Sequence, residues 1–233
     1  MSKKMVDKPK TAEACLEAVL QDGSALEYVP EELKTEILCG IAVLKDGLAI
    51  EHVPEILRTE GLFIDAVAQE GLALKFVPEE MRTEAFFLAV VQRNGSALQY
   101  VPETLKTEAL CLAAVQQEGS ALNYVSETLK SEAFYLAAVR RNGFALQYVP
   151  EAIKTESLCL AAIQRNAIAL IHVPKVLKTE AFCLASVQKN SMAFIYVPKE
   201  LKTEAVCLAV VKQWDVLLQY VPEELKATIS KML

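Results

Sequence analysis

Apolar and polar residues follow one another along this 233-residue chain in a pattern that repeats every 24 residues. Each repeat contains a mostly apolar run, such as residues 109–115, and a shorter apolar stretch that ends in Val-Pro, such as residues 145–150. The Val-Pro pair recurs at the same interval, except that Val125 is followed by Ser126. A fixed period of this length is typical of a repeat protein. We predict a single domain of nine repeats over residues 11–226, an N-terminal head over residues 1–10 and a C-terminal cap over residues 227–233.

The first half of each repeat carries the signals of an α-helix. Counting positions from the first residue of a repeat, position 1 is threonine, or serine at Ser131, in all nine repeats, as expected of a helix N-cap. Position 2 is glutamate in eight repeats, which suits the positive end of the helix dipole. Position 13 is glycine in six repeats, and a left-handed glycine often follows the end of a helix. We therefore predict a helix over positions 2–12 that ends at a left-handed glycine.

The second half of each repeat is shorter, as in residues 96–106. Proline fixes its own backbone, disfavours helical angles in the valine before it, and is a good first residue of a new turn. We predict a short helix over positions 14–18, a bend at Val-Pro, and one more helical turn that ends at the basic residue of position 24. A strand over residues 97–101, as in leucine-rich repeats, is the alternative, because an alternation of five residues does not exclude it.

A unit of this size cannot bury its own apolar face, so its stability must come from stacking on its neighbours. The favoured fold class is therefore all-α, an α-solenoid of nine helical repeats. The end repeats depart from the pattern as capping repeats do: Glu13 and Glu17 replace small residues in the first, and Trp214 and Asp215 replace Asn-Gly in the last. Three apolar residues of the C-terminal cap are expected to cover the terminal core, namely Ile229, Met232 and Leu233.

Residues 106–117 and 145–151 resemble, in spacing and residue type, the repeat catalogued as domain of unknown function 4116. The resemblance covers residues 11–226. That family occurs in tandem arrays, mainly in bacteria, some of them host-associated. The resemblance implies a helical repeat array with no established activity and no functional residues to transfer. A looser likeness, of architecture only, links the 24-residue unit to the leucine-rich repeat variant, in which α- and 3₁₀-helices alternate.

Composition narrows the classes of function. Apolar residues make up 53% of the chain, which is too many for a disordered protein, and no apolar run approaches the ~18 residues that span a bilayer. The lysines of residues 1–10 have no apolar stretch behind them, so we predict no signal peptide. The net charge of -6 gives no general reason to expect nucleic-acid binding. Six unpaired cysteines favour a reducing compartment, so we expect a cytoplasmic protein or one delivered into a host cell.

The residue types that carry most chemistry fall in packing positions. All six cysteines occupy position 5, which is Phe or Tyr in the other repeats, so we expect buried thiols and neither a disulfide nor a zinc site. His52 and His172 occupy position 18, which is otherwise aromatic, and we expect each to keep a polar tip in water. The sequence contains no nucleophile–base pair, phosphate-binding loop or metal motif. We therefore expect no catalytic residue, no cofactor, no metal and no enzyme activity.

Position 24 is Lys or Arg in every repeat, and glutamate stands three residues before most of these cations. Ladders of opposite charge commonly form a solvated face of weak ion pairs, which is the expectation here. A second group of cations falls at the C-terminal ends of the predicted long helices, where the helix dipole favours positive charge. This group comprises Arg93, Arg140, Arg141, Arg165, Lys189 and Lys212.

A candidate partner surface lies along positions 3, 7 and 10, which share one face of the long helix. This face is acidic at several places in the first and third repeats, so it must reach water. In the second repeat it is apolar, and exposed apolar clusters often mark interaction sites. The cluster consists of Leu20, Ile37, Ile41 and Leu44. The alternative, that Gly40 lets this helix roll so that Ile41 joins the core, is equally open.

Charge is unevenly distributed along the array. Repeats one to five hold 8 basic and 20 acidic residues, whereas repeats six to eight hold 9 basic and 5 acidic residues. The basic repeats supply Arg140, Arg141 and Arg165 as candidate residues for an acidic partner, although drift among duplicated repeats is the simpler explanation. The favoured function is a non-enzymatic scaffold that binds a protein or peptide along its surface, without nucleic-acid or membrane partners. The alternative is a structural protein that self-assembles end to end through its acidic and basic portions.

Overall fold

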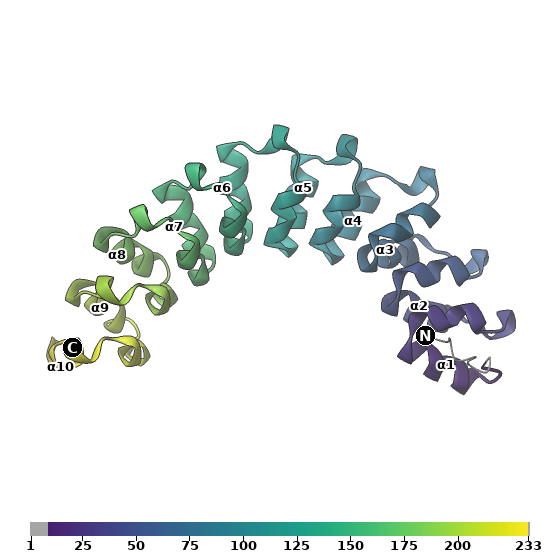
Figure 1. Cartoon of the computed structure of the whole chain (residues 1–233), viewed down its shortest axis with the longest axis horizontal. Coiled ribbons are helices and arrows are strands. Elements are labelled where there is room, and N and C mark those ends of the chain that lie inside the picture. Colours follow the sequence, from purple (N-terminus) through teal and green to yellow (C-terminus); the bar gives the residue numbers. More distant parts are fainter. Residues whose placement is uncertain (1–8, 233) are drawn as a thin grey trace, which may run out of the picture. The chain divides into compact units, whose positions relative to one another are not determined.

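The structure is a computed structural model that describes residues 9–232, and these residues form α- and 3₁₀-helices without a strand (Figure 1). Repeats one to eight each consist of an α-helix over positions 2–11, a 3₁₀-helix over positions 13–18 and a short 3₁₀-turn over positions 21–23. The prediction of an all-α solenoid is therefore confirmed, and the strand alternative is wrong, because residues 97–100 are helical. No helix of the described residues is both long enough and apolar enough to span a membrane.

The α-helices of the described residues are α1 (Ala12–Gln21), α2 (Glu36–Lys45), α3 (Glu60–Gln69), α4 (Glu84–Arg93), α5 (Glu108–Gln117), α6 (Glu132–Arg141), α7 (Glu156–Arg165), α8 (Glu180–Lys189), α9 (Glu204–Val211) and α10 (Glu223–Met232). The six-residue 3₁₀-helices are η1 (Gly23–Tyr28), η3 (Gly47–His52), η5 (Gly71–Phe76), η7 (Gly95–Tyr100), η9 (Gly119–Tyr124), η11 (Gly143–Tyr148), η13 (Ala167–His172), η15 (Ser191–Tyr196) and η17 (Asp215–Tyr220). The three-residue turns are η2 (Glu31–Leu33), η4 (Glu55–Leu57), η6 (Glu79–Met81), η8 (Glu103–Leu105), η10 (Glu127–Leu129), η12 (Glu151–Ile153), η14 (Lys175–Leu177) and η16 (Lys199–Leu201).

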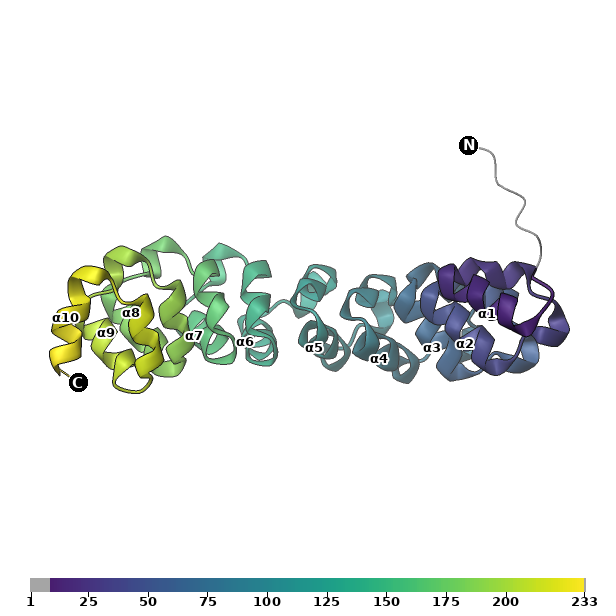
Figure 2. The ribbon, with the colours of Figure 1, turned by 90° about the horizontal axis from the view of Figure 1, so that it is seen from below.

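The chain divides into two compact units, an N-terminal half that ends at Gln117 and a C-terminal half that begins at Glu118. In the N-terminal half, helices α1 to α5 pack side by side in chain order, and η1, η3, η5 and η7 form a second row (Figures 1 and 2). In the C-terminal half, α6 to α9 form one row and η9 to η17 the other, and α10 packs against α9. Each half therefore has an α layer and a 3₁₀ layer. The prediction of one continuous domain over residues 11–226 stays a prediction.

The core of each half lies between its two layers. Positions 4, 5, 8 and 9 of the α-helix and positions 15, 16 and 19 supply most of the buried side chains. In the fourth repeat these are Phe86, Phe87, Val90, Val91, Ala97, Leu98 and Val101. All six cysteines are buried and unpaired at position 5, which confirms that they are packing residues. Burial of a large apolar side chain contributes about 1.5–3 kcal/mol, and here that burial depends on the neighbouring repeats.

A hydroxyl at position 1 caps each of the nine repeat helices, as predicted. Its oxygen accepts a hydrogen bond from the backbone N–H of position 4 at 3.1–3.4 Å in every repeat. Two of these hydroxyls also donate to the position-2 glutamate of the preceding repeat: Thr107 to Glu84, and Thr203 to Glu180, each at 2.7 Å. The cap therefore joins neighbouring helices as well as closing its own.

The C-terminal end of the long helix differs from the prediction. The helix stops at position 11 in repeats one to eight, and position 12 is extended, with φ near -147° at Asp22. The Asp22 backbone N–H still bonds the Ala18 carbonyl, and the Asp22 carboxylate accepts the N–H of Ser24 at 3.0 Å. Asp or Asn makes the same side-chain bond in five further repeats. No glycine of the described residues has a positive φ, so the predicted left-handed glycine is wrong.

The glycine at position 13 instead allows consecutive repeats to approach each other closely. A Cβ atom added at Gly23 would lie 2.5 Å from the carbonyl oxygen of Ala42 in the next repeat. A Cβ atom at Gly47 would collide with the Ala66 carbonyl in the same way. Backbone atoms cannot move aside as a flexible side chain does, so at Gly23 and Gly47 glycine is required by the spacing between repeats rather than by its own dihedral angles, whereas repeats seven to nine carry Ala, Ser and Asp at this position.

The ends of the array are capped partly as expected. Glu13 and Glu17 are exposed, and α10 replaces the short turn of the other repeats. Ile229 of α10 is fully buried, as predicted, and Met232 is half exposed. Leu233 and residues 1–8, which include most of the predicted head and the segment assessed for a signal peptide, lie outside the described residues.

We predict that Gly47→Ala and Gly40→Ala change stability in opposite directions. The first places a methyl group against a backbone carbonyl and should lower the free energy of unfolding by about 1–3 kcal/mol. The second fills open space in the interior of α2, where nothing lies within 4 Å of an added Cβ, and should raise it by about 0.5–1 kcal/mol. Urea unfolding followed by circular dichroism measures both. Changes of the same sign would mean that position 13 is not the close contact.

We also predict that Thr107→Ala lowers the free energy of unfolding by about 1 kcal/mol, because the N-cap of α5 is lost. Gln117→Ala, at the exposed last residue of the same helix, is the control and should be close to neutral. Thermal unfolding of the two variants beside the wild type makes the comparison. Equal losses would show that the cap at position 1 does not stabilise the helix.

Candidate functional site

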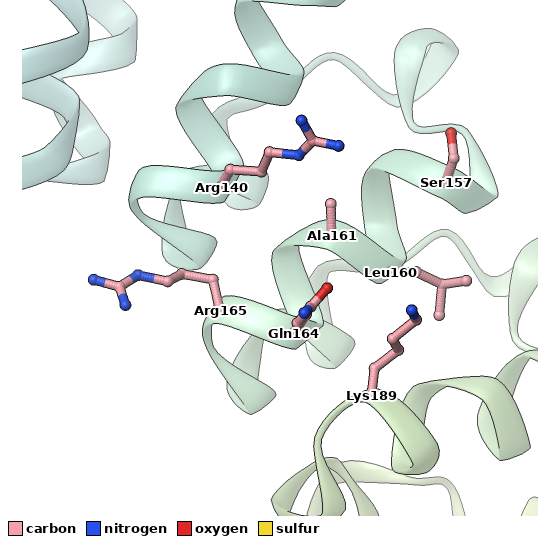
Figure 3. A pocket seen from close by; sticks show the side chains of 7 residues that line it. All are labelled: Arg140, Ser157, Leu160, Ala161, Gln164, Arg165 and Lys189. Carbon is pink, nitrogen blue, oxygen red and sulfur yellow. The ribbon is translucent and has the colours of Figure 1, made fainter.

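A hollow of about 600 Å³ opens on the α layer of the C-terminal half (Figure 3). Helix α7 forms its floor, and one cation enters from each neighbouring helix, Arg140 from α6 and Lys189 from α8. The lining residues are Arg140, Ser157, Leu160, Ala161, Gln164, Arg165 and Lys189. The volume lies within the ~300–1,000 Å³ range of ligand sites.

The repeat explains why a hollow forms at this place. Ser157, Ala161 and Gln164 occupy positions 3, 7 and 10 of α7, which fall on one face of a helix with 3.6 residues per turn. Two of these residues are small, so the floor is low, while positions 10 and 11 of the flanking helices carry the long side chains of Arg140 and Lys189. The predicted stripe of positions 3, 7 and 10 is therefore accessible. The hollow owes its depth to the short side chains of the floor beside the long side chains of the flanking helices.

The hollow is positively charged and contains no carboxylate among its lining residues. Within the described residues, the side chains of Arg140 and Lys189 form no hydrogen bond or ion pair. In Figure 3 both side chains point toward α7 from opposite sides, whereas the Arg165 guanidinium points away from Gln164. The Arg165 Nε donates to the backbone carbonyl of Arg141 at 3.0 Å. The structure thus brings Arg140 and Arg165 to one hollow, while Arg141 contributes a backbone carbonyl beside it.

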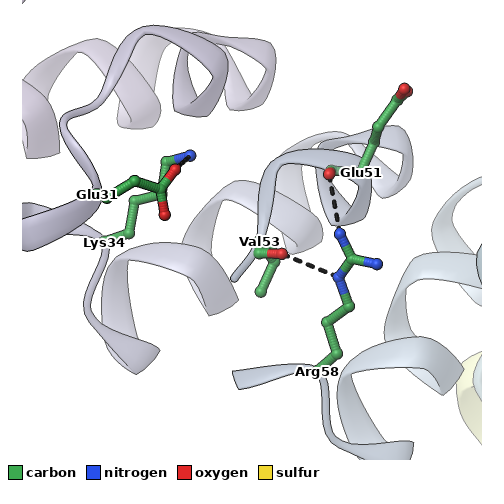
Figure 4. Close-up of polar contacts among 5 residues, drawn as sticks. All are labelled: Glu31, Lys34, Glu51, Val53 and Arg58. Atoms are coloured by element: carbon green, nitrogen blue, oxygen red, sulfur yellow. Dashed lines mark hydrogen bonds and ion pairs between the residues drawn. The ribbon is translucent and has the colours of Figure 1, made fainter. Parts of the chain in front are cut away.

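The cations of position 24 form the predicted ion pair with the glutamate three residues earlier in four repeats, but most of these cations are not solvated as the sequence suggested. All nine are partly buried, and only 6% of the Lys34 side chain is exposed although its partner Glu31, at 2.6 Å, lies in water (Figure 4). In Figure 4 the Arg58 guanidinium donates instead to the backbone carbonyls of Val53 and Glu51, at 2.9 and 3.0 Å. Five of the nine cations bond carbonyls near the C-terminal ends of the 3₁₀-helices, where carbonyl groups lack a partner within the helix, and the other four pair with a glutamate.

Two cations of position 24 bond across a repeat boundary. The Lys154 Nζ donates to the carbonyl of His172, and the Lys202 Nζ to the carbonyl of Tyr220, each at 3.1 Å. Burial lowers the pKa of Lys202, and burial likewise lowers the pKa of Lys178, with a smaller contribution from Lys175. The lowered pKa values agree with ammonium groups that are withdrawn from water rather than displayed to it.

The predicted apolar cluster is exposed in part. Ile37, Leu44 and Leu20 have exposed fractions of 76%, 60% and 48%, whereas Ile41 is only partly exposed. The core of α2 uses positions 4, 5, 8 and 9, as in α4, so this helix has not rolled and the alternative in which Ile41 joins the core is wrong. Three of the four residues therefore lie on the accessible face, and their role in binding stays a prediction.

A second, apolar hollow of about 230 Å³ was missed from the sequence. It lies between η15 and η17 and is lined mainly by Met192, Trp214 and Val216, all more than half exposed. The signal that could have found it is Trp214 at position 12, which is Asp, Glu or Asn in the other repeats. Lys189 was expected only to suit the helix dipole, whereas the structure places it at the hollow over α7.

His172 differs from its predicted role. Its ring packs edge-on against Phe144 with centroids 5.4 Å apart, and its buried Nε2 has no hydrogen-bond partner in the described part of the chain. The polar tip is therefore not in water. Burial lowers the pKa of His172, and the nearby charges of Lys154 and Lys178 lower it further.

Burial raises the pKa of the thiols of Cys39, Cys183 and Cys207, and raises it to about 11 for Cys111 and Cys159. Burial outweighs the opposing effect of Lys106 on Cys111 and of Lys154 on Cys159. These thiols are protonated at neutral pH, so they are neither nucleophiles nor ready metal ligands. Among residues 9–232 no cluster of three or more His, Cys, Asp or Glu side chains is suited to hold a metal ion.

The fold and the accessible face define a tandem helical repeat protein of the α-solenoid class. A family model described as Domain of unknown function (DUF4116) matches residues 13–58, 59–106, 83–130, 107–154, 131–178 and 155–202, and each match spans about two repeats. The chain belongs to this family, as the resemblance of its repeats indicated. No curated protein and no solved structure matches the chain.

We predict that the stability of the protein falls below about pH 6.5 partly because of His172. Its pKa is lowered in the folded state, so the unfolded chain binds the proton first and the free energy of unfolding decreases as the pH falls through the ordinary histidine value. In His172→Phe, which suits a position that is Phe76 in another repeat, this contribution should disappear. Urea unfolding between about pH 5 and 8 measures it. Parallel stability curves for wild type and variant would contradict the prediction.

Proposed function

We propose that this protein is a non-enzymatic repeat scaffold that binds a protein or peptide partner along the exposed face of its α-helices. The observation that carries the proposal is the division of positions within each helix. Stacking buries positions 4, 5, 8 and 9 and leaves positions 3, 7, 10 and 11 largely accessible. These accessible positions change from acidic in α1 to apolar in α2 and basic in α6 to α8. Repeat proteins use extended surfaces of this kind for binding.

The absence of enzyme activity is part of this proposal. The thiols that a cysteine-dependent reaction needs are buried, and burial raises the pKa of five of them, from Cys39 to Cys207, which disfavours the reactive thiolate. The cations that resemble a phosphate-binding ladder close backbone carbonyls or pair with glutamate. The accessible face offers shape, exposed apolar area and charge, and these properties support binding of a partner.

Self-assembly is a second candidate because the two halves differ in charge. The N-terminal half carries 11 basic and 19 acidic residues, and the C-terminal half 13 basic and 11 acidic residues. Molecules with regions of opposite charge can associate through heterologous contacts that do not close. Static light scattering over a range of protein and salt concentrations separates the candidates, because a partner-binding scaffold stays monomeric and an assembling protein grows at low salt.

We predict that Ile37→Glu/Leu44→Lys abolishes capture of a partner that the wild type retains from lysate of the source cells or of their host. Both side chains are exposed, so the substitutions should remove an apolar contact without unfolding α2. Quantitative mass spectrometry of the captured proteins is the measurement, after circular dichroism has shown that the proteins fold alike.

The matched control is Ile56→Glu/Val176→Lys, which changes two apolar residues that are 92% and 83% exposed on the short turns η4 and η14. This control should capture the same partner as the wild type. Recovery of the partner by all three proteins, or by none of them, would count against the accessible face of α1 and α2 as the binding surface.

A further inference from the structure

One ion pair in the N-terminal half shows how the α layer holds a carboxylate. The Asp65 Oδ1 of α3 lies 2.6 Å from the Arg93 Nε of α4. Asp65 is at position 7 of its repeat and Arg93 is at position 11 of the next. Position 7 of α3 and position 11 of α4 are therefore close enough to place a carboxylate against a cation. A pair this exposed adds little to stability, but it shows where a carboxylate can meet a cation on the α layer.

The same pair of positions in the C-terminal half has the cation and lacks the carboxylate. Lys189 stands at position 11 of α8, where the preceding position 7 is Ala161. Arg165 stands at position 11 of α7, where the preceding position 7 is Ala137. Ala161 lies in the floor of the 600 Å³ hollow, between the side chains of Arg140 and Lys189 (Figure 3). If repeat seven carried an aspartate at position 7, as repeat three does at Asp65, its side chain would occupy the hollow.

We infer that this hollow binds an acidic peptide segment of a partner protein, with one of its carboxylates next to Lys189 as Asp65 stands next to Arg93. Arg140 faces the hollow from the opposite side and holds a second carboxylate of the same segment. Gln164 and Ser157 offer amide and hydroxyl groups for the peptide backbone, and Leu160 and Ala161 offer apolar contact to its side-chain stems. This inference rests on the proposed function and names the partner chemistry.

The lining favours a peptide over a nucleic acid. Single strands bind proteins by stacking their bases on aromatic side chains above a cationic track, and none of the lining residues is aromatic. The cations of the hollow are few, and the chain as a whole has a net charge of -6, which repels a long polyanion. A short segment with carboxylates on an otherwise uncharged backbone fits a small cationic hollow with an aliphatic floor.

The decisive variant is Ala161→Asp in the full-length protein. It supplies internally the carboxylate that the partner would supply and should weaken binding of a fluorescein-labelled peptide of alternating Glu and Ser by about tenfold or more in fluorescence anisotropy. Arg140→Gln/Lys189→Gln should have a similar effect. Binding to the wild type should weaken as salt is added, and the same peptide with Gln in place of Glu should not bind.

Two controls change charge by the same amount away from the hollow. Ala89→Asp introduces the same residue at position 7 of the fourth repeat, where position 11 of the next helix is Gln117 rather than a cation. Lys175→Gln/Lys231→Gln removes two exposed cations of the C-terminal half that do not line the hollow. Both controls should bind the acidic peptide within about twofold of the wild type, since exposed charges at a distance are screened.

Equal weakening by Ala161→Asp and Ala89→Asp would overturn the inference, because only net charge would then matter. Tighter binding of a single-stranded oligonucleotide than of the peptide, lost in Ala161→Asp, would assign the hollow to nucleic acid instead. A wild type that sediments as an oligomer and an Ala161→Asp variant that sediments as a monomer would assign it to a second copy of the chain. If the captured partner is lost in Ile37→Glu/Leu44→Lys but the acidic peptide fails to bind, this inference falls and the proposed function stands.

Discussion

The close approach of backbone to backbone between consecutive repeats is the constraint on which the rest of the structure depends. A repeat of this size must share its core with its neighbours, and in the first repeats the neighbours come so close that position 13 has no room for a Cβ atom beside the next carbonyl group, as at Gly23 and Ala42. That spacing brings position 5 of each helix into a fully covered core, where a thiol packs as a small apolar group. Polar groups that this stacking buries need protein partners, and among the buried side-chain nitrogen and oxygen atoms of the described residues only the His172 Nε2 lacks one.

Those partners are mostly backbone carbonyls and helix-end groups, and the side chains that reach them recur with the repeat. The position-1 hydroxyl closes the start of a helix and in two repeats also binds the previous helix. The Asn94 amide reaches back to the Ala68 carbonyl at 2.6 Å, and the Asn190 amide to the Ile163 carbonyl at 3.0 Å. Five of the position-24 cations, among them Arg58 and Lys202, bond carbonyls at the ends of the 3₁₀-helices. Polar residues that recur at the same position in the repeats therefore mostly bond backbone groups of the array itself, and those polar atoms are not free to bind a partner.

The sequence was sufficient for features that depend on one repeat, and insufficient for those that depend on two. The helix start at position 1, the thiol core at position 5 and the bend at Val-Pro follow from local capping, period and proline geometry. The glycine of position 13 was misread because its cause lies in the next repeat, at the Ala42 carbonyl for Gly23. The lysines of position 24 were misread for a similar reason, since a charge pattern does not show which carbonyl an ammonium reaches. The sequence also did not show that position 7 of α3 pairs with position 11 of α4, as Asp65 and Arg93 do in the structure.

Each helix has positions that pack or cap and positions that remain accessible, and this division explains why the candidate sites lie where they do. A side chain that is required for stacking or capping cannot change without loss of stability, whereas the accessible positions 3, 7, 10 and 11 of the α-helices can differ between repeats. A single substitution there changes a local surface and leaves the stacking residues intact. An aspartate at position 7 neutralises the next cation in the N-terminal half, and an alanine at the same position leaves Lys189 without a carboxylate in the C-terminal half. Ligand specificity in such an array therefore depends on which of these positions carry a charged side chain that no other residue of the chain neutralises.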